Sequence, residues 1–410
     1  MTFYEQFQTI SAPVTEAEKN AKLRWDSIAK PLGSLGRLEK AVIRLAGISG
    51  NANKVSVKKA GLVIMCADHG VVEEGVTQTG YEVTNVVATN FTKGKTSVNA
   101  MADTIGVDVF PIDIGMKTSP VKEKELKPLT LVDRKIAMGS LNIAKEAAMS
   151  IEQCENAVQV GIDSVRDLKQ KGYEILATGE MGIGNTTPSS ALAAVLLGQE
   201  VENVTGKGAG LSNSSLELKI KAIKRAIKRY YSIVDSLKGL ESKEMSSLDM
   251  ASKDMDPLDM NSKDKDSMDM DSVNKDILII NDAQSAINIL AQLGGYDIAG
   301  LVGVFLGGAI YKIPIVIDGF ISSVAALLAV TIEPKARYYM FPSHESKEPA
   351  GRMVLEALQM KPFITCDMYL GEGTGAIAVL PILNMAVEVY QKMSTFKEIE
   401  IEEYKQFNLQ

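Results

Sequence analysis

Two short glycine-rich stretches each enclose a glutamate, and these residue types at this spacing could do chemistry. The first stretch, GEMGIGNTTP, covers residues 179–188 and precedes a helical pattern. Glycines let a backbone approach a phosphate closely, and the free N–H groups at the start of a helix attract an anion. Glu180 repels phosphate, so we expect its carboxylate to meet ribose hydroxyls or a reacting base. The glycines could equally serve the sterics of a tight strand-to-helix turn, with Thr186 as its cap.

The second stretch, LGEGTGA at residues 370–376, also precedes an apolar helical run. A glutamate between two glycines is either a surface turn residue or a buried carboxylate. In the second case burial raises the pKa of the carboxyl, which suits a general base near neutral pH. The residues alone leave both interpretations of Glu372 open.

Other candidate residues carry weaker signals. The segment FTKGKTS at 91–97 superficially resembles a P-loop, but that pattern requires a glycine five positions before Gly94 and Thr89 stands there. His69 and His344 both follow predicted strands, and two widely separated histidines are more typical of hydrogen-bonded loops than of a zinc site. We therefore predict no metal. Lys219 could reach an anion, but a lysine in a Lys/Arg-rich helix is by default solvated.

Bulk composition excludes several classes of protein. The 410 residues carry a net charge of −7 at pH 7, so there is no basic surface of the kind that nucleic acid needs. Three widely separated cysteines form no CxxC pair, which favours a reducing, cytoplasmic compartment. The N-terminus does not resemble a signal peptide. The most apolar stretch, residues 298–330, is interrupted by charged residues and a proline, so we expect no membrane span.

The glycine loops need a scaffold, and short apolar runs followed by polar loops and helical patterns predict one. This alternation predicts an α/β fold with a parallel, Rossmann-like sheet and flanking helices. The expected strands are Gly61–Ala67, Val107–Ile112, Tyr173–Ala177, Ile313–Ile317 and Arg337–Phe341. Ligands bind at the carboxyl edge of such sheets. The loops at that edge are 68–70, 113–115, 179–187, 318–319 and 343–344.

The chain divides into a large and a small part. Residues 1–40 and 380–410 look mainly helical and are predicted to pack together as a small domain, with the α/β catalytic domain at 41–379. Within the latter, residues 242–271 form three tandem copies of a ten-residue unit rich in Ser, Lys, Asp and Met. Such a composition buries too little apolar area to offset chain entropy, so we predict a disordered low-complexity insertion.

Three motifs in one order make a specific combination. KPLGSLGRLE at 30–39, GEMGIGNTT and LGEGTGA together resemble the nicotinate-nucleotide-dimethylbenzimidazole phosphoribosyltransferase family, and the likeness runs nearly the whole chain. The resemblance implies a Rossmann-like large domain, a small helical domain from both chain ends, and a homodimer. It also implies a reaction in which nicotinate leaves C1′ of its mononucleotide and a benzimidazole-type base attacks from the opposite face.

The resemblance also implies roles for particular residues. Glu372 would be the general base for the azole N–H, and Glu180 a second acidic contact near the ribose. The residues expected to hold substrate and phosphate are Gly182, Gly184, Asn185, Thr186, Lys219, Gly371 and Gly373. Those expected to line the base pocket are Thr77, Val86 and Leu370. Nicotinate is already a competent leaving group, so no cofactor and no magnesium ion are expected.

Departures from the family pattern keep alternatives open. The family's EPGHR continuation is EPAGR at 348–352, so its histidine is missing, and Thr77 stands where serine is common. Val86 stands where a glutamine of the base-side wall is expected. A paralogue using another base, such as a phenol, and a non-catalytic partner subunit both remain. An NAD-dependent oxidoreductase does not fit, because GxGxxG after the first strand and the acid about 20 residues later are absent.

Overall fold

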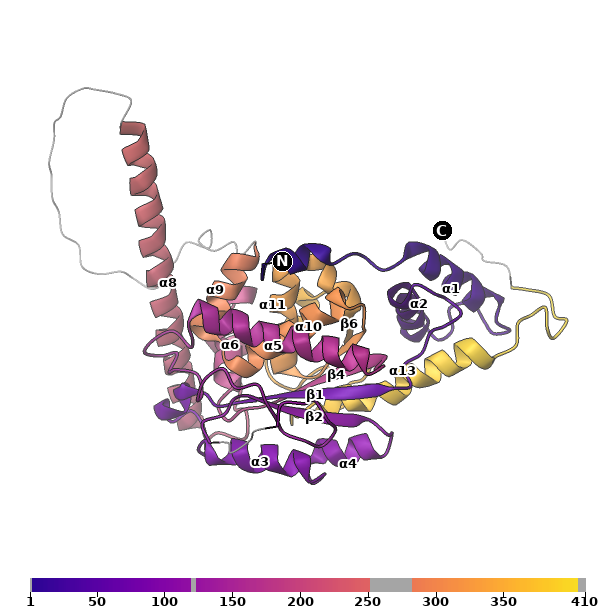
Figure 1. Ribbon diagram of the computed structural model, residues 1–410, viewed down its shortest axis with the longest axis horizontal. Coiled ribbons are helices and arrows are strands. Elements are labelled where there is room, and N and C mark those ends of the chain that lie inside the picture. Colours follow the sequence, from indigo (N-terminus) through magenta and orange to yellow (C-terminus); the bar gives the residue numbers. More distant parts are fainter. Residues whose placement is uncertain (1, 119–122, 251–281, 405–410) are drawn as a thin grey trace.

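A single parallel sheet organises the large part of the chain. The computed structural model describes residues 2–118, 123–250 and 282–404 (Figure 1). Neighbouring strands all pair in parallel, in the order β3-β2-β1-β4-β5-β6. This is the strand order of doubly wound dinucleotide-binding folds, and it confirms the predicted α/β class. The strands are β1 (Ala60–Ala67), β2 (Asp108–Gly115), β3 (Val132–Asp133), β4 (Ile175–Met181), β5 (Ile315–Ile317) and β6 (Met340–Pro342).

Burial on both faces explains the composition of the central strands. All eight residues of β1, AGLVIMCA, are buried, as parallel strands covered by helices on both sides require. The five predicted strands are present with shifted ends. The largest shift is at β4, which continues to Met181 and not only to Ala177. The strand β6 begins three residues later than expected, because Pro334–Tyr339 forms a 3₁₀ helix. β3 was missed, since two residues give no periodicity.

Helices cover both faces of the sheet. Figure 1 shows α5 (Ile151–Gln170), α10 (Tyr296–Ile310) and α11 (Phe320–Ile332) above it, with α3 (Glu82–Thr92) and α4 (Ser97–Asp103) below. Helices α5 and α10 cross with their backbones in contact, because a Cβ on Gly303 would lie only 1.9 Å from the Val158 carbonyl oxygen. The remaining helices of this part are α6 (Thr186–Leu197), α7 (Val201–Val204), α8 (Asn213–Met250), α9 (Ala283–Leu293) and α12 (Gly351–Ala357).

The two chain ends pack together. Helices α1 (Thr15–Ser27) and α2 (Arg37–Ser49) contact each other, and α2 also contacts α13 (Thr374–Lys392). The rings of Trp25 and Tyr390 lie 5.1 Å apart. Helices α2 and α13 both run across the boundaries expected at 40/41 and 379/380, so the division into two folding domains stays a prediction.

Helix α13 is also the one helix among the described residues that is long and apolar enough to cross a membrane. That assignment rests on length and composition alone, and 56% of the relevant window is buried within the protein. A core helix of a globular protein has the same properties.

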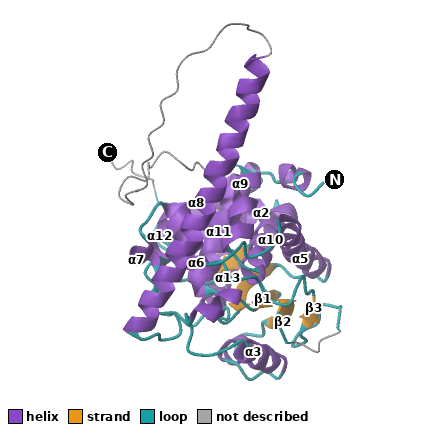
Figure 2. Cartoon of the chain, turned by 90° about the vertical axis from the view of Figure 1, so that its left-hand side faces the viewer, coloured by secondary structure: helices purple, strands orange, loops and turns teal. Residues whose placement is uncertain are grey.

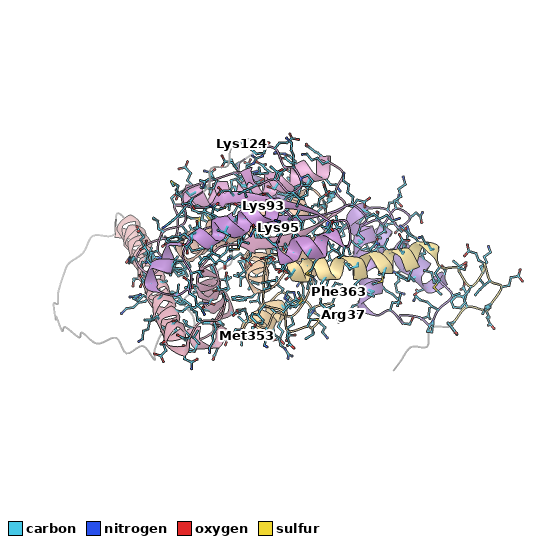
Figure 3. All side chains as sticks on the ribbon, turned by 90° about the horizontal axis from the view of Figure 1, so that it is seen from below. Arg37, Lys93, Lys95, Lys124, Met353 and Phe363 are labelled. Atoms are coloured by element: carbon cyan, nitrogen blue, oxygen red, sulfur yellow. The ribbon has the colours of Figure 1, made fainter. Side chains whose placement is uncertain are left out.

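The KPLGSLGRLE motif has a structural use in this arrangement. Lys30 Nζ and Glu39 Oε1 form a buried ion pair 2.5 Å long, and Glu39 also accepts the Leu35 N–H at 3.0 Å. Arg37 donates to the Pro362 carbonyl oxygen, and Figure 3 shows Arg37 near Phe363. The motif therefore connects the helical end of the chain to the segment that leads to Glu372.

Part of the tandem repeat is helical. Residues 242–250, most of the first copy, lie in the last turns of α8, which extends well beyond the body of the protein (Figures 1 and 2). A disordered insertion at 242–271 therefore stays a prediction, with its first nine residues continuing α8. Lys, Glu, Leu and Met in SKEMSSLDM are good helix formers, so α8 continues into it. Residues 251–271 lie outside the described residues.

Candidate active site

The candidate site lies where the sheet reverses its winding. Strands β1 and β4 are neighbours, and chain connections lead away from them in opposite directions along the sheet. β1 runs into Asp68 and His69, and β4 ends in Glu180 and Met181. A crevice outside the carboxyl ends of such a strand pair is where doubly wound folds bind ligands. The GEMGIGNTT segment begins in this position and continues into α6.

The two glycine-enclosed glutamates are neighbours in space. A Cβ on Gly371 would lie 2.4 Å from Glu180 Oε1, and a Cβ on Gly179 would lie 2.5 Å from the Glu372 carbonyl oxygen. Any side chain at either glycine would separate the two loops. The glycines therefore serve the close approach of two protein segments, which brings together the two acids predicted from sequence.

Glu372 occupies an uncommon backbone conformation. Its φ is +60°, and Gly371 and Gly373 on either side have φ of +85° and +95°. The side chain points toward α4, where Oε2 accepts the Val98 N–H at 3.3 Å. Burial raises the pKa of the Glu372 carboxyl, the Val98 hydrogen bond lowers it, and the charge of Asp318 raises it. Both interpretations of Glu372 thus hold in part, because it is a turn residue and also a half-buried acid with a raised pKa.

Glu180 is more deeply buried. Burial, followed by the charge of Asp297, raises its pKa from 4.5 to about 8. Asn185 Nδ2 donates to Glu180 Oε2 and also lies 3.1 Å from Asp297 Oδ2. Behind them, His69 Nε2 lies 3.0 Å from Asp297 Oδ1. Glu180 therefore carries a proton at neutral pH and can donate a hydrogen bond, whereas the ordinary carboxylate can only accept one.

We expect Glu180→Gln to stabilise the protein in a pH-dependent way. The unfolded chain releases this proton above pH 4.5 and the folded chain only near pH 8, so wild-type stability falls between these values and the full penalty is present above pH 8. The shift bounds the gain in unfolding free energy at roughly 5 kcal/mol. Thermal denaturation should give similar melting temperatures for both proteins at pH 5. At pH 9 the variant should melt several degrees higher.

A matched control is Glu356→Gln, because Glu356 is an exposed acid on α12 that pairs with Arg352. Its melting temperature should follow that of the wild type across the pH range. A constant difference between Glu180→Gln and wild type from pH 5 to pH 9 would show that Glu180 does not hold a buried proton.

Lys219 corrects one expectation. Its side chain is fully buried, with Nζ donating to Thr186 Oγ1 at 2.8 Å and to the Gly206 carbonyl oxygen at 3.0 Å. Burial lowers its pKa to about 8, against the charge of Glu348. The prediction that Lys219 is solvated is wrong, because Lys219 lies on the buried face of α8. The residues on that face have helical spacing readable in the sequence, at Lys219, Ala222, Ile223, Ala226 and Tyr230.

The start of α6 is built differently from the expected threonine cap. Asn185 is the N-cap residue and makes no side-chain cap, and Thr186 is the first helical residue. The Thr186 hydroxyl is instead used by Lys219. Gly182 lies against the Ala67 carbonyl oxygen, 2.5 Å from where its Cβ would be, and Gly184 has φ of +95°. Phosphate binding by this segment stays a prediction.

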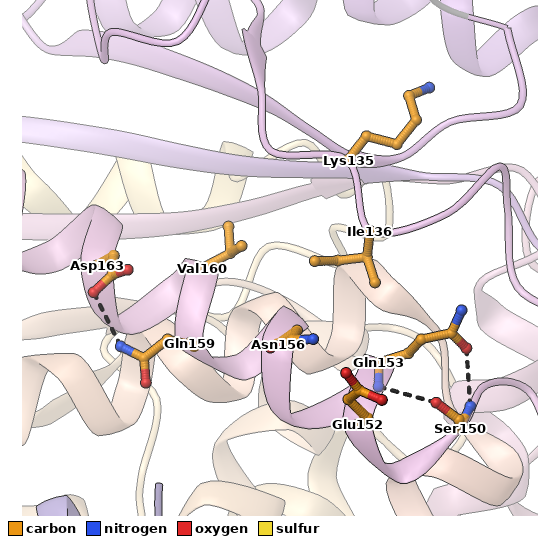
Figure 4. A pocket seen from close by; sticks show the side chains of 9 residues that line it. All are labelled: Lys135, Ile136, Ser150, Glu152, Gln153, Asn156, Gln159, Val160 and Asp163. Atoms are coloured by element: carbon orange, nitrogen blue, oxygen red, sulfur yellow. Dashed lines mark hydrogen bonds between the residues drawn. The ribbon is translucent and has the colours of Figure 1, made fainter. Parts of the chain in front are cut away.

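The predicted base pocket is only partly assembled in the single chain. Thr77 lies beside Gly184, with its Cγ2 3.8 Å from where a Cβ on that glycine would be. Val86 and Leu370 are 55% and 58% exposed, so neither lines an enclosed cavity. Hollows of about 650 Å³ lie elsewhere, one beside α5 (Figure 4) and one along α8. Neither hollow is lined by a residue predicted for the site.

Several buried polar residues at this edge received no role from sequence. They are His69, Asp297 and Asp318, together with the half-buried Glu348. A signal was present, since each lies at the carboxyl end of a strand, at the start of a helix, or in the loop after β6. Across residues 2–118, 123–250 and 282–404, no group of three or more His, Cys, Asp and Glu side chains is arranged to hold a metal ion. The absence of metal from the reaction stays a prediction.

Comparisons with known proteins agree over most of the chain. A family model described as "Phosphoribosyltransferase" matches residues 10–252 and 263–401. The nicotinate-nucleotide–dimethylbenzimidazole phosphoribosyltransferase of Acetivibrio thermocellus is 40% identical over 98% of this chain and 99% of its own. The protein of the same name from Chloroflexus aggregans is 36% identical over 95% of each chain. The crystal structure of CobT from Thermus thermophilus matches with a TM-score of 0.76 and 31% identity, covering 95% of this chain and 100% of that one.

The match to the family model is interrupted within the tandem repeat. Residues 253–262 are unmatched, whereas 242–252 and 263–271 fall within the matched ranges. The segment that departs from the family is therefore narrower than the predicted insertion of 242–271, and it is one repeat unit long.

Proposed function

The chain belongs to the nicotinate-nucleotide–dimethylbenzimidazole phosphoribosyltransferase family, and from that premise we propose how its own residues carry the reaction. The enzyme transfers the 5-phosphoribosyl group of nicotinate mononucleotide to 5,6-dimethylbenzimidazole. The products are α-ribazole 5′-phosphate and nicotinate, in cobalamin biosynthesis. The observation that supports the assignment of residues is the contact between the Glu180 and Glu372 loops at the end of β4.

The donor's phosphate is proposed to bind near Lys219. The Lys219 ammonium is buried and donates to the neutral oxygens of Thr186 and Gly206, with the carboxylate of Glu348 as a charged neighbour. A buried charge of this kind is stabilised by an anion. Thr186, the first residue of α6, contacts Lys219, so the positive end of that helix adds to the attraction for an anion. The phosphate of the mononucleotide supplies the anion.

The two glutamates are proposed to act on the two sides of the exchange at C1′. The bond from C1′ to the nicotinate nitrogen breaks, and its electron pair neutralises the pyridinium. One nitrogen of the benzimidazole forms the new bond to C1′ while the other ring nitrogen releases its proton to Glu372. Glu180, protonated at neutral pH, donates a hydrogen bond to a ribose hydroxyl. No cofactor is needed for any of these steps.

A direct assay tests this function. Purified protein is incubated with nicotinate mononucleotide and, separately, with 5,6-dimethylbenzimidazole, benzimidazole, adenine or phenol. Chromatography then measures release of nicotinate and formation of the riboside. Nicotinate release that depends on a benzimidazole supports the proposal. Release only with phenols would identify a paralogue with another acceptor, and no release with any acceptor would favour a non-catalytic partner subunit.

We expect the wild-type enzyme to discriminate weakly among benzimidazoles. Val86 is apolar and largely exposed, so it offers no hydrogen bond to an acceptor base. An apolar wall separates close analogues by only about 10–200-fold. Competition between 5,6-dimethylbenzimidazole and benzimidazole should give a ratio of kcat/KM values in this range, and Val86→Gln should change that ratio.

Leu23→Gln is the control for Val86→Gln, since Leu23 is also an exposed apolar residue and lies on α1. Its ratio should equal that of the wild type. A thousandfold preference of the wild type for one benzimidazole would contradict the proposed permissive wall.

We also propose that the enzyme is a cytoplasmic homodimer. The family resemblance supports the dimer, and the free thiols of Cys66, Cys154 and Cys366 support a reducing compartment. Light scattering coupled to size-exclusion chromatography measures the assembly directly. A monomer mass of 44.2 kDa at micromolar concentration would contradict the dimer.

A further inference from the structure

A buried carboxylate that has no role in the proposed chemistry lies beside the Glu372 loop. Asp318 follows β5 and is only 2% exposed. Its Oδ2 accepts the N–H of Gly373 at 3.2 Å. Its Oδ1 accepts the N–H groups of Gly375 and Ala376 at 2.8 Å and 3.1 Å. Three backbone groups at the start of α13 are thus held by one side chain from another part of the chain.

The local sequence explains why α13 needs this partner. The first N–H groups of a helix have no partner within the helix, and a Ser, Thr, Asp or Asn at the N-cap usually satisfies one of them. The N-cap of α13 is Gly373, which has no side chain to do so. Nor could another residue replace it easily, because a Cβ there would lie 2.5 Å from Leu62 Cδ1. Asp318 supplies the missing cap.

Asp318 is itself fixed by hydrogen bonds on its backbone. Its N–H lies 3.3 Å from Thr178 Oγ1 and 3.2 Å from Ser322 Oγ, and its carbonyl oxygen accepts the Ser343 hydroxyl at 3.0 Å. Thr178 belongs to β4 and lies two residues before Glu180. The carboxylate of Asp318 therefore connects a rigid part of the sheet to the residue that follows Glu372.

We propose that Asp318 is a positioning residue for Glu372, which it serves by anchoring the Gly373 N–H and by placing a fixed negative charge beside the base. The inference rests on the proposed function of Glu372. A residue with a Cβ adopts φ near +60° only when its surroundings hold it there. Asp318 on one side and the Val98 N–H on the other fix both the backbone and the carboxylate of Glu372.

The charged groups around Asp318 are few. Glu180 and Glu372 approach it from their loops, and the charge of Asp318 raises the pKa of both. His344 packs on the start of α13 and lowers the pKa of Asp318, although burial raises it overall. Removing the charge of Asp318 should therefore lower the pKa of Glu372, in addition to loosening its loop.

Asp318→Asn separates positioning from simple stability. The amide keeps one oxygen for Gly375 and Ala376 but turns an NH₂ group toward the Gly373 N–H. We expect kcat to fall by about 10–100-fold, the effect typical of residues that orient a reacting group through another. The KM for nicotinate mononucleotide should change less than about threefold. The acid limb of the kcat–pH profile should move to lower pH, which a loss of folded protein alone would not cause.

Asp282→Asn is the matched control, because Asp282 caps α9 with its side chain, accepting the Ser285 N–H at 2.7 Å, and is itself exposed. Its kcat and pH profile should equal those of the wild type. If Asp318→Asn does not fold, Thr178→Val removes one contact of the Asp318 N–H and should lower kcat about 3–10-fold at unchanged KM.

The outcomes are distinct. A kcat for Asp318→Asn within twofold of wild type, a lower kcat with an unmoved acid limb, or a wild-type kcat for Thr178→Val when Asp318→Asn does not fold would each overturn the positioning role. Wild-type protein that releases no nicotinate in the same assay would overturn the proposed function together with it.

Discussion

Replacing Glu372 by glutamine is expected to lower kcat for benzimidazoles by roughly 10²–10⁴ while nicotinate mononucleotide still binds. Glutamine keeps the size of the side chain and can still accept the Val98 N–H, but it cannot take a proton. The azole then attacks C1′ without losing its N–H proton, which leaves a positive charge on the new riboside. Steady-state kinetics with varied donor and acceptor give kcat and both KM values.

Glu388→Gln serves as the control for this experiment. Glu388 lies on the same helix, α13, and pairs with Lys58 and Lys392 at the far end from the site. Its kcat should be that of the wild type. If Glu372→Gln retained more than about a tenth of wild-type kcat, the loss in the barrier would be under roughly 1.4 kcal/mol, and Glu372 would not be the general base.

Replacing Lys219 by methionine is expected to raise the KM for nicotinate mononucleotide by roughly 10–150-fold, the equivalent of one charge-assisted hydrogen bond of about 1.5–3 kcal/mol. Methionine fills the same buried space, so the fold is kept. Burial lowers the pKa of Lys219, so the buried ammonium destabilises the wild type at neutral pH and this penalty disappears as pH rises from about 8 toward 10.5. The variant should therefore melt higher than wild type at pH 7 and equally at alkaline pH.

Lys224→Met is the matched control for Lys219→Met. Lys224 lies on the same helix and forms a surface ion pair with Glu202. Its KM should be unchanged, and its melting temperature should not rise. An unchanged KM in Lys219→Met would show that the phosphate binds elsewhere, whatever the melting temperature does.

The place of Glu180 at the carboxyl edge of the sheet could be predicted from the sequence, whereas a shared site with Glu372 was implied only by the family resemblance. Glu180 comes at the end of a predicted strand, and such ends meet at one edge of a parallel sheet. Lys219 could have been placed better by the same means. Apolar residues follow Lys219 at helical spacing, and this pattern indicates that Lys219 lies on the buried face of α8. The contrary expectation rested only on the fact that lysine side chains are usually solvated.

The role of Asp318 could not be predicted in this way. It depends on how the end of β5 lies against the start of α13. These two segments are far apart in the sequence, and only the folded sheet brings them together. A residue far away in the sequence supplies the cap, so no local motif indicates it. The raised pKa of Glu180 also depends on the whole fold, since burial raises it most and the charges of Asp297 and Asp318, from two other segments, add to it.

The pairing of the two chain ends has a consequence for synthesis on the ribosome. Arg24 donates to the Tyr390 carbonyl oxygen across 366 residues, and the Ala29 N–H donates to the Ser394 carbonyl oxygen. The ribosome adds about 5–20 residues per second, so roughly 20–70 s pass between the synthesis of Trp25 and the synthesis of the residues that pack against it. During that time α1 and α2 have no helix α13 to cover them. The helical end of the nascent enzyme therefore exposes apolar surface that a chaperone could cover during this interval, although its residues are translated first.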